Sequence, residues 1–255
     1  MADQAQGLRK LVEKMGRDRP VPLFPESRVV AITSGKGGVG KSNLAVNLAL
    51  ALKEYGKKVL VFDADLGLGN IDIIMGIIPS FTLAHVVRGE RELQDIIISE
   101  YGIKLIAGGS GVEELLELPD WQLRNFLSRL RDLEGVGDYV LFDTGAGINR
   151  HVLGFVLAAT DIIVVTTPEP TAITDAYALL KVIASKNREA VVRLVVNRAV
   201  NAQEARQVVR KLRFVAREFL SLELVDLGYI PEDPSISRAV KAQKPFLYAY
   251  PRSPA

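Results

Sequence analysis

The chain has 255 residues, 48% of them hydrophobic, and its 32 basic residues nearly balance 30 acidic ones. A chain of this length can bury about three quarters of its unfolded surface, so we expect one large α/β domain. The absence of cysteine excludes disulfides, thiolate-bound zinc and iron–sulfur clusters. The charge balance gives no overall bias towards nucleic acid or acidic lipid. No apolar run is long enough for a membrane span, and the polar N-terminus is unlike a signal peptide, so we expect a soluble cytoplasmic protein.

The first 27 residues divide into a short helix and a tether. Apolar residues within 2–16 recur at the spacing of one helical face, and Gly16 is a plausible stop. Residues 17–27 contain three prolines, which forbid a helix and favour an extended tether. We therefore expect residues 1–27 to form an N-terminal helix and tether, and residues 28–255 to form the main domain. Periodicity alone leaves open whether this helix packs on the domain or binds a partner.

A glycine-rich loop follows the first predicted strand, residues 29–33, and precedes a predicted helix, residues 44–52. The loop, Gly35-Lys36-Gly37-Gly38-Val39-Gly40-Lys41-Ser42, matches G-x-x-x-x-G-K-S/T at every fixed position. Its glycines let successive N–H groups point inward, and the helix adds the positive end of its dipole, so the backbone can hold a polyphosphate. Lys41 would reach the β- and γ-phosphates, and the Ser42 hydroxyl would bind Mg²⁺. The sequence therefore predicts a P-loop that binds ATP or ADP with Mg²⁺.

Two further predicted strands end in carboxylates. Residues 59–62 lead into Asp63 and Asp65, and residues 139–142 lead into Asp143. Carboxylates at the carboxyl ends of parallel strands are costly unless they serve a cation or a proton. Asp143 fits the Walker B pattern, in which the carboxylate holds Mg²⁺ through water. Asp63 and Asp65 fit either a cation site or a capped turn with solvated aspartates.

The remaining elements complete an α/β pattern. We expect helices at 81–87, 119–133 and 201–220, a strand that enters a glycine turn at 104–109, and strands at 161–167 and 191–196. Strands that alternate with helices imply right-handed crossovers. The sequence thus predicts a P-loop NTPase fold with a mainly parallel twisted sheet and helices on both faces.

Two C-terminal segments allow more than one interpretation. The helix at 201–220 is strongly basic on one side, which fits a solvated face over the sheet or a docking site for an acidic partner or DNA. Residues 245–255 are too short and too broken by proline for a membrane-binding helix. Membrane attachment would therefore require a C-terminal helix beyond the given chain.

The loop contains a second lysine, Lys36, at a position where an ordinary P-loop needs no charge, because Lys41 and the backbone amides already neutralise the phosphates. With it, the loop resembles the deviant Walker A motif K-G-G-x-G-K-S/T of MinD, ParA and their relatives. In that family the early lysine reaches across a nucleotide-sandwiched dimer to the partner's phosphates. The resemblance implies a MinD/ParA-like fold and an ATP-dependent homodimer, with Lys36 coupling ATP binding to dimerisation.

Other family motifs recur in the chain. Residues 63–70 resemble the switch I motif D-x-D-x-G-L-x-N, which implies that Asp63 supports the Mg²⁺ shell and Asp65 orients the attacking water. Asn197 resembles the asparagine that hydrogen-bonds the adenine, although an asparagine at a strand end is also a common helix cap. The resemblance implies further nucleotide contacts at Arg198, Pro231, Glu232 and Asp233.

The run Asp3-Gln4-Ala5-Gln6-Gly7-Leu8-Arg9 resembles the D-Q-A-x-x-L-R element of the FlhG (FleN) family, MinD-like ATPases of flagellar placement and number. In that family the element stimulates the GTPase FlhF. The resemblance implies that Asp3, Gln4, Ala5, Leu8 and Arg9 bind this partner, with Gln4 and Arg9 facing its nucleotide site and Leu8 as the anchor. It further implies flagellar switch (C-ring) proteins or a transcription regulator as partners, and a location in the cytoplasm or on the inner face of the membrane.

Three alternatives share parts of this pattern. A MinD-type division-site ATPase has the same core but no reason to carry residues 3–9. A ParA-type DNA-segregation ATPase would use the basic helix, and marked salt dependence of nonspecific DNA binding would support it, but we expect no DNA partner. A bacterial tyrosine kinase of related fold would carry a C-terminal tyrosine cluster, and Tyr248 and Tyr250 are too few. We therefore expect a regulatory Mg²⁺-dependent ATPase that switches between monomer and dimer and controls flagella.

Overall fold

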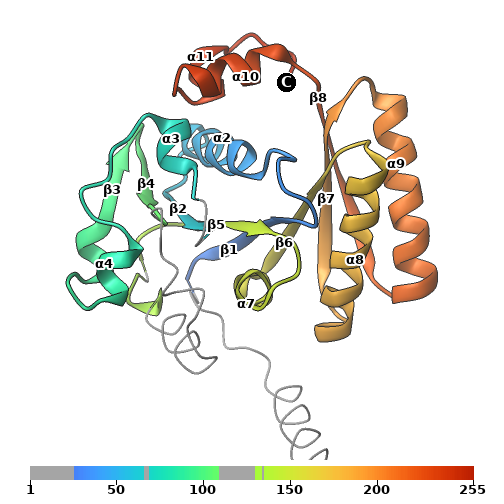
Figure 1. The fold of residues 1–255 in the computed structure, drawn as a ribbon, viewed down its shortest axis with the longest axis horizontal. Helices are drawn as coiled ribbons and strands as arrows, with labels where there is room; N and C mark the ends of the chain where they lie inside the picture. The colour runs from blue at the N-terminus through green and yellow to red at the C-terminus, as the bar shows by residue number, and fades with distance from the viewer. Residues whose placement is uncertain (1–25, 66–68, 109–129, 134) are drawn as a thin grey trace, which may run out of the picture.

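The computed structural model describes residues 26–65, 69–108, 130–133 and 135–255. They form an eight-stranded sheet in the order β3-β4-β2-β5-β1-β6-β7-β8, with helices on both faces (Figure 1). Neighbouring strands are parallel except β3 and β4, which pair antiparallel at one edge. The predicted fold class, a mainly parallel sheet covered on both faces, is confirmed.

The element boundaries are as follows. The strands are β1 (Arg28–Ser34), β2 (Val59–Ala64), β3 (Ile97–Glu100), β4 (Ile103–Ile106), β5 (Tyr139–Ala146), β6 (Asp161–Thr166), β7 (Val191–Ala199) and β8 (Glu223–Pro231). The α-helices are α2 (Lys41–Glu54), α3 (Ile71–Met75), α4 (Leu83–Val87), α7 (Arg150–Ala158), α8 (Pro170–Lys186), α9 (Ala202–Val215), α10 (Pro234–Lys241) and α11 (Phe246–Ala249). Shorter turns are the 3₁₀ segments η1 (Leu93–Ile96) and η2 (Leu130–Leu133) and the π-helical segment η3 (Ala216–Leu220).

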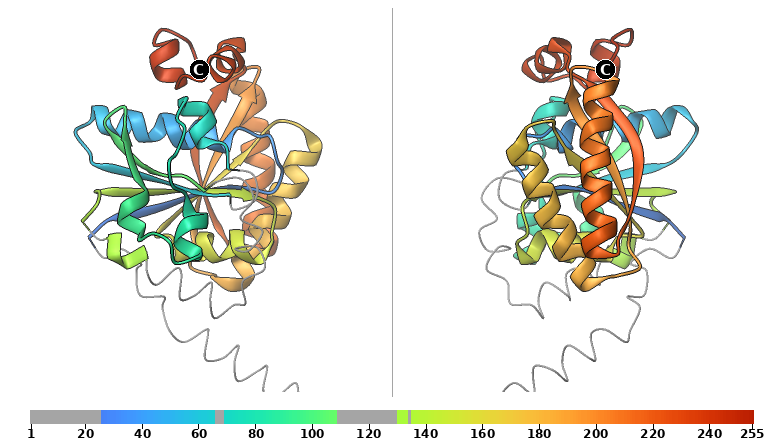
Figure 2. Two further views of the ribbon diagram at one scale, coloured as in Figure 1. Left: turned by 60° about the vertical axis from the view of Figure 1, so that its left-hand side comes forward. Right: turned by 90° about the vertical axis from the view of Figure 1, so that its right-hand side faces the viewer.

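The central strands are buried on both faces. In β1, Val29 and Ala31 belong to the core under α4, α7, α8 and α9, whereas Val30 and Ile32 belong to the core under α2 and α3. Successive side chains of a strand point to opposite faces, so a strand covered on both sides must be apolar throughout. Figure 2 shows the two helical layers from the side. The uninterrupted apolar runs of the sequence are therefore explained by the two layers.

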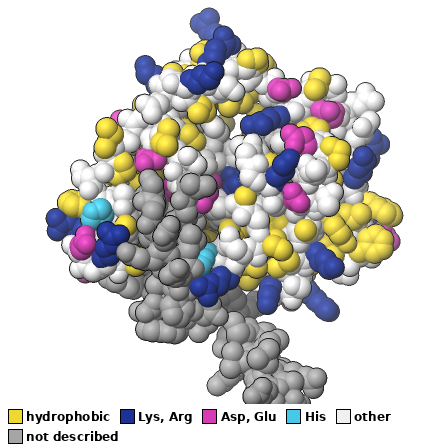
Figure 3. Space-filling model, in the orientation of Figure 1, with side chains coloured by type: hydrophobic (Ala, Val, Ile, Leu, Met, Phe, Trp, Pro, Cys, Tyr) yellow, Lys and Arg dark blue, Asp and Glu magenta, His cyan; other side chains and the backbone are white. Residues whose placement is uncertain are grey.

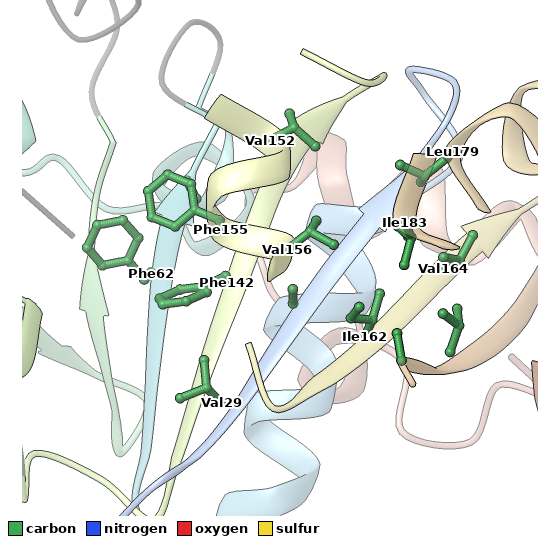
Figure 4. Packing of buried hydrophobic residues seen from close by; sticks show 14 of the residues in the cluster. Val29, Phe62, Phe142, Val152, Phe155, Val156, Ile162, Val164, Leu179 and Ile183 are labelled. Carbon is green, nitrogen blue, oxygen red and sulfur yellow. The ribbon is translucent and has the colours of Figure 1, made fainter. Parts of the chain in front are cut away.

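Three aromatic rings fix the centre of the larger core (Figure 4). Phe62 of β2 and Phe142 of β5 are paired in register, with ring centroids 5.6 Å apart in an edge-to-face arrangement. Phe155 of α7 covers both, with centroids 5.7 and 5.2 Å away. Such contacts add to the free energy of burial of the three rings. This packing holds the ends of β2 and β5, where the acidic residues follow, side by side.

The observed elements can be compared with those predicted from the sequence. The strands predicted at 29–33, 59–62, 139–142, 161–167 and 191–196 correspond to β1, β2, β5, β6 and β7, and the strand predicted to enter a glycine turn at 104–109 corresponds to β4. The helix predicted at 119–133 lies mostly outside the described residues, and residues 130–133 form a 3₁₀ turn. The predicted N-terminal helix and tether, apart from residues 26 and 27, also lie outside them. Strands β3 and β8 were not predicted, because both are edge strands whose exposed positions interrupt the apolar pattern.

Candidate nucleotide-binding site

The glycine-rich loop joins the carboxyl end of β1 to the first residue of α2. Gly38 and Gly40 have φ angles of 75° and 98°, in the left-handed region that side chains rarely adopt. A β-carbon on Gly35 would collide with the carbonyl oxygen of Asp175 in α8, and one on Gly40 would collide with the amide of Asn197. The loop therefore needs glycine for its backbone turn and for its close packing against β7 and α8.

Lys41 and Ser42 form the first turn of α2, directly after the loop. The Lys41 side chain is buried. Burial lowers the pKa of its ammonium group, and the nearby charges of Asp143 and Asp65 oppose this shift. A buried cation beside the start of a helix is what a polyphosphate requires.

Asp63 and Asp143 are neighbours in the sheet. They are paired in register at the ends of β2 and β5, and both point to the α2 side, opposite to the aromatic core. Each is 1% exposed. The Asp63 carboxylate accepts hydrogen bonds from the backbone N–H groups of Asp65 (3.1 Å) and Ile71 (3.4 Å). Neither carboxylate oxygen of Asp143 has a hydrogen-bond partner among the described residues.

Burial and the charges of neighbouring carboxylates raise the pKa values of both Asp63 and Asp143. Burial raises the pKa of Asp143 to about 7, and the Asp65 charge adds to the shift. The Ser42 hydroxyl and the Lys41 ammonium oppose it, although the hydroxyl makes no well-formed hydrogen bond to either Asp143 oxygen. Burial and the Asp143 charge raise the pKa of Asp63 well above its usual value. A cation held by these residues would favour the ionised form of both carboxyl groups and lower both pKa values.

The residues fit Mg²⁺. Ser42, Asp63 and Asp143 offer hard oxygen donors, and the unpartnered Asp143 oxygens are the kind of buried polar atoms that an ion would satisfy. Within the described ranges, no group of three or more acidic or histidine side chains could hold a metal by itself. Magnesium commonly completes its shell with phosphate oxygens and water, so the donor set is consistent with an ion bound together with nucleotide.

Asp65 lies next to Gly145 of β5. A β-carbon on Gly145 would lie 3.2 Å from the Asp65 Oδ1 atom and 3.5 Å from its carboxyl carbon. Glycine at this position therefore leaves room for the carboxylate predicted to orient water. The following residues of the predicted switch I motif, 66–68, lie outside the described residues.

Lys36 contacts its own chain. Its ammonium group lies 2.7 Å from the Glu169 carboxylate and 2.9 Å from the Thr171 hydroxyl, at the start of α8. The Lys36 side chain is 38% exposed and that of Glu169 is 56% exposed. The ion pair lowers the pKa of Glu169. Water and salt screen such exposed pairs, so Lys36 can leave this partner at little cost.

A cavity of about 900 Å³ opens beside the loop. Its lining includes residues predicted to contact the base, namely Asn197, Arg198, Glu232 and Asp233, together with Gly40 of the loop. Pro231 ends β8 just before this lining. The sequence did not indicate four other lining residues, Asn43, Asn47, Phe246 and Leu247, although the four-residue spacing of the two asparagines on α2 was visible.

Asn197 joins the cavity to the loop. Its side-chain amide donates to the Val39 carbonyl at 2.7 Å, and its side-chain oxygen accepts from the Arg198 N–H at 2.9 Å. Helix α9 is capped by Asn201, whose side chain accepts from Gln203 and Glu204. Helix capping by Asn197, the alternative raised by the sequence, is therefore wrong.

The C-terminal segment covers the same cavity from above (Figure 1). Phe246 is buried, the Leu247 N–H donates to the Asn47 side chain at 2.9 Å, and Ser253 hydrogen-bonds Asp233. None of the helices in the described ranges is both long and apolar enough to cross a membrane.

Residues 30–246 match the model of the CobQ/CobB/MinD/ParA nucleotide-binding domain family. The chain belongs to this family. It is 39% identical to the antiactivator FleN of Pseudomonas aeruginosa over 245 residues, which cover 96% of this chain and 85% of that protein. It is 43% identical to the flagellum site-determining protein YlxH of Helicobacter pylori over 223 residues, covering 86% and 74%. These similarities support membership of the FlhG/FleN branch.

A solved structure with the same fold is the septum site-determining protein MinD of Pyrococcus horikoshii, complexed with Mg-ADP. It has a TM-score of 0.74 and 27% identity, with 89% of this chain and 90% of that chain covered. This chain is accordingly a MinD/ParA-type P-loop ATPase whose cofactors are a nucleotide and Mg²⁺.

Proposed function

We propose that this protein is an ATP-dependent dimerising switch that controls the placement and number of flagella. The observation that carries the flagellar role is the similarity to FleN and YlxH over 96% and 86% of the chain. The switch is supported by Lys36, the extra lysine of the deviant loop, and by its weak attachment to Glu169. Through residues 3–9, the N-terminal helix would stimulate the GTPase FlhF. Flagellar switch (C-ring) proteins or a transcription regulator are further candidate partners.

Each site residue has a defined task in this proposal. Lys41 and the loop amides hold the phosphates, while Ser42, Asp63 and Asp143 hold Mg²⁺, which neutralises phosphate charge when bound. Asp65 orients the attacking water, in the space that Gly145 leaves open. Asn197, Arg198 and residues 231–233 enclose the base.

The dimer is the output of the switch. On ATP binding, Lys36 exchanges Glu169 for the phosphates bound by a second copy. Hydrolysis removes the γ-phosphate and returns the protein to the monomer. The protein acts in the cytoplasm or peripherally on the inner face of the cell membrane.

Sedimentation velocity tests the dimer. Wild type, Lys36→Ala, Asp65→Ala and the exposed control Lys57→Ala are compared with ATP and with ADP. We expect wild type and Lys57→Ala to dimerise on ATP, Lys36→Ala to bind nucleotide as a monomer, and Asp65→Ala to remain dimeric after prolonged incubation. A Lys36→Ala protein that still dimerises on ATP would disprove the cross-dimer role of this lysine.

GTP hydrolysis by FlhF tests the flagellar partner. It is measured with the full-length protein and with a synthetic peptide of residues 1–20, as wild type, Gln4→Ala and Gln6→Ala. Gln6 is the matched control because it occupies a variable position of the motif. We expect stimulation by wild type and Gln6→Ala and its loss in Gln4→Ala. Absence of stimulation by both peptide and full-length protein would refute this partner and favour a division-site ATPase.

A further inference from the structure

A second surface lies far from the nucleotide site, at the opposite end of the sheet. Helix α9 runs from the carboxyl end of β7 to the amino end of β8, and η3 prolongs it (Figure 2, right). A groove of about 790 Å³ lies where η3 meets β8. We name it the α9 groove; its lining residues are Arg210, Arg213, Phe214, Arg217 and residues 221–224.

The α9 groove is locally basic in a chain that is almost neutral. Three arginines line it, and Arg206 and Lys211 lie on the same helix. The Nε of Arg213 donates to the Leu224 carbonyl at 2.9 Å, which orients its guanidinium while using one of five N–H donors. Arg217 is paired with the adjacent Glu218 at 3.0 Å, but its side chain is 78% exposed. The groove thus holds guanidinium groups that are oriented or exposed for carboxylate recognition.

Two large exposed apolar side chains belong to the same helical segment: Phe214 lines the groove, and Phe219 lies in η3. Phe214 is 56% exposed and Phe219 is 70% exposed. The π-helical segment η3, which contains Phe219, continues α9 directly after Val215. In Figure 3, hydrophobic side chains gather at the lower end of α9, with Lys and Arg side chains near them. Aromatic residues and arginine are the residue types enriched in protein interfaces.

The basic charge of the α9 groove indicates which kind of partner it can bind. The chain's own first 25 residues carry five basic and three acidic residues, so the α9 groove would repel them. A second copy of the chain would bring the same basic surface in a symmetric contact. Nucleic acid binds through a positive field over many phosphates, whereas the net charge of the chain is only +2 and three arginines line the groove.

We propose that the α9 groove binds an acidic segment of another protein, one that carries large apolar side chains. Carboxylates of this segment would pair with Arg210, Arg213 and Arg217, and its apolar side chains would pack on Phe214 and Phe219. The site is separate from the nucleotide cavity, and the proposal needs neither dimerisation nor FlhF. It gives the protein a second docking surface, whatever the first partner is.

Fluorescence anisotropy with the full-length protein tests this site. The probe is a labelled helical peptide of about 15 residues with Glu on one face and Leu and Phe on the other. A peptide with Gln in place of Glu and a single-stranded oligonucleotide serve as competitors. Arg217→Ala and Phe214→Ala are compared with two exposed controls outside the groove, Lys241→Ala and Tyr55→Ala.

We expect each groove substitution to weaken peptide binding about ten-fold, as for a hot-spot side chain, and the controls to bind like wild type. ATP hydrolysis and thermal stability should stay unchanged, because both groove side chains are exposed. Failure of the acidic peptide to bind would overturn the proposal, as would equal losses in the control variants. Preferential displacement by the oligonucleotide would assign the groove to nucleic acid and equally overturn it.

Discussion

The carboxyl group of Asp143 makes the stability of this protein depend on pH in a defined direction. Burial raises its pKa from 3.8 to about 7, whereas in the unfolded chain it ionises near its usual value. The native state therefore holds more protons between these two values, and the free energy of unfolding must fall as pH rises through that window. A difference of about three pH units corresponds to about 4 kcal/mol at pH values above 7.

The substitution Asp143→Asn preserves the shape and removes the ionisable group. In the absence of nucleotide and Mg²⁺, we expect the variant to be more stable than wild type at pH 8. At pH 5.5 this advantage should be smaller by about 2 kcal/mol, because native Asp143 is then protonated. Urea unfolding in EDTA at both pH values measures the difference. Glu54→Gln, an exposed carboxylate on α2, is the matched control and should follow wild type.

Binding of Mg²⁺ and ADP should reverse this order of stability, so that wild type becomes more stable than Asp143→Asn at pH 8. In wild type the ion replaces the proton as the counter-charge of Asp143, so stabilisation by Mg²⁺ with ADP should grow with pH. The variant should lose the Mg²⁺-dependent part of that stabilisation. Two results would refute this reasoning: nucleotide-free Asp143→Asn is less stable than wild type at pH 8, or both proteins show the same pH dependence of stability. Either result would mean that the Asp143 carboxylate already has a stabilising partner in the nucleotide-free protein.

Three further substitutions probe single contacts. Asp161 is bound by Arg28 and Arg193, which lower its pKa against a smaller effect of burial. Its ionised carboxylate should therefore stabilise the fold at neutral pH by about 1 kcal/mol. In urea unfolding Asp161→Asn should lose this contribution, and the difference from wild type should shrink once pH falls below the usual pKa of an aspartate. Gly35→Ala should prevent correct folding or cost more than about 2 kcal/mol, because its β-carbon would collide with backbone atoms of α8. Gly37→Ala is the control and should keep the wild-type melting temperature, because a β-carbon there would lie 4.0 Å from the Ala146 β-carbon, an ordinary contact. Asn197→Ala removes the hydrogen bond to the Val39 carbonyl and should weaken nucleotide binding about ten-fold in a fluorescent ATP-analogue titration; unchanged affinity would contradict its assigned role.

The sequence predicts those parts of the fold whose signals are local. The glycine-rich loop, the helix that follows it, and the apolar strands before Asp63 and Asp143 can each be recognised within about ten residues, although the helix begins at Lys41 and not at the predicted residue 44. The central strands are recognisable because two helical layers require apolar residues on both faces. The edge strand β8 lacks this requirement, since half of its positions face solvent, and no local pattern distinguishes it from a loop.

Contacts between distant parts of the chain could not be predicted. Asn47 and Leu247 meet across 200 residues, and Lys36 meets Glu169 across 133. The cavity beside the glycine-rich loop therefore forms only when the C-terminal segment folds back over α2. The same holds for the α9 groove. The basic helix can be recognised in the sequence, but Phe219 is exposed within a π-helical segment that has no recognisable signal in propensity or period.

Strand register connects the hydrophobic core to the chemistry. Phe62 pairs with Phe142, and the next residues along each strand, Asp63 and Asp143, pair on the opposite face. A slip by one residue would move both the rings and the carboxylates to the wrong faces, at the cost of the aromatic packing around Phe155. The buried rings thus stabilise the only register that sets two costly carboxylates side by side beneath Lys41 and Ser42. Part of the free energy of the core is in this way used to keep an unfavourable pair of charges ready for a cation.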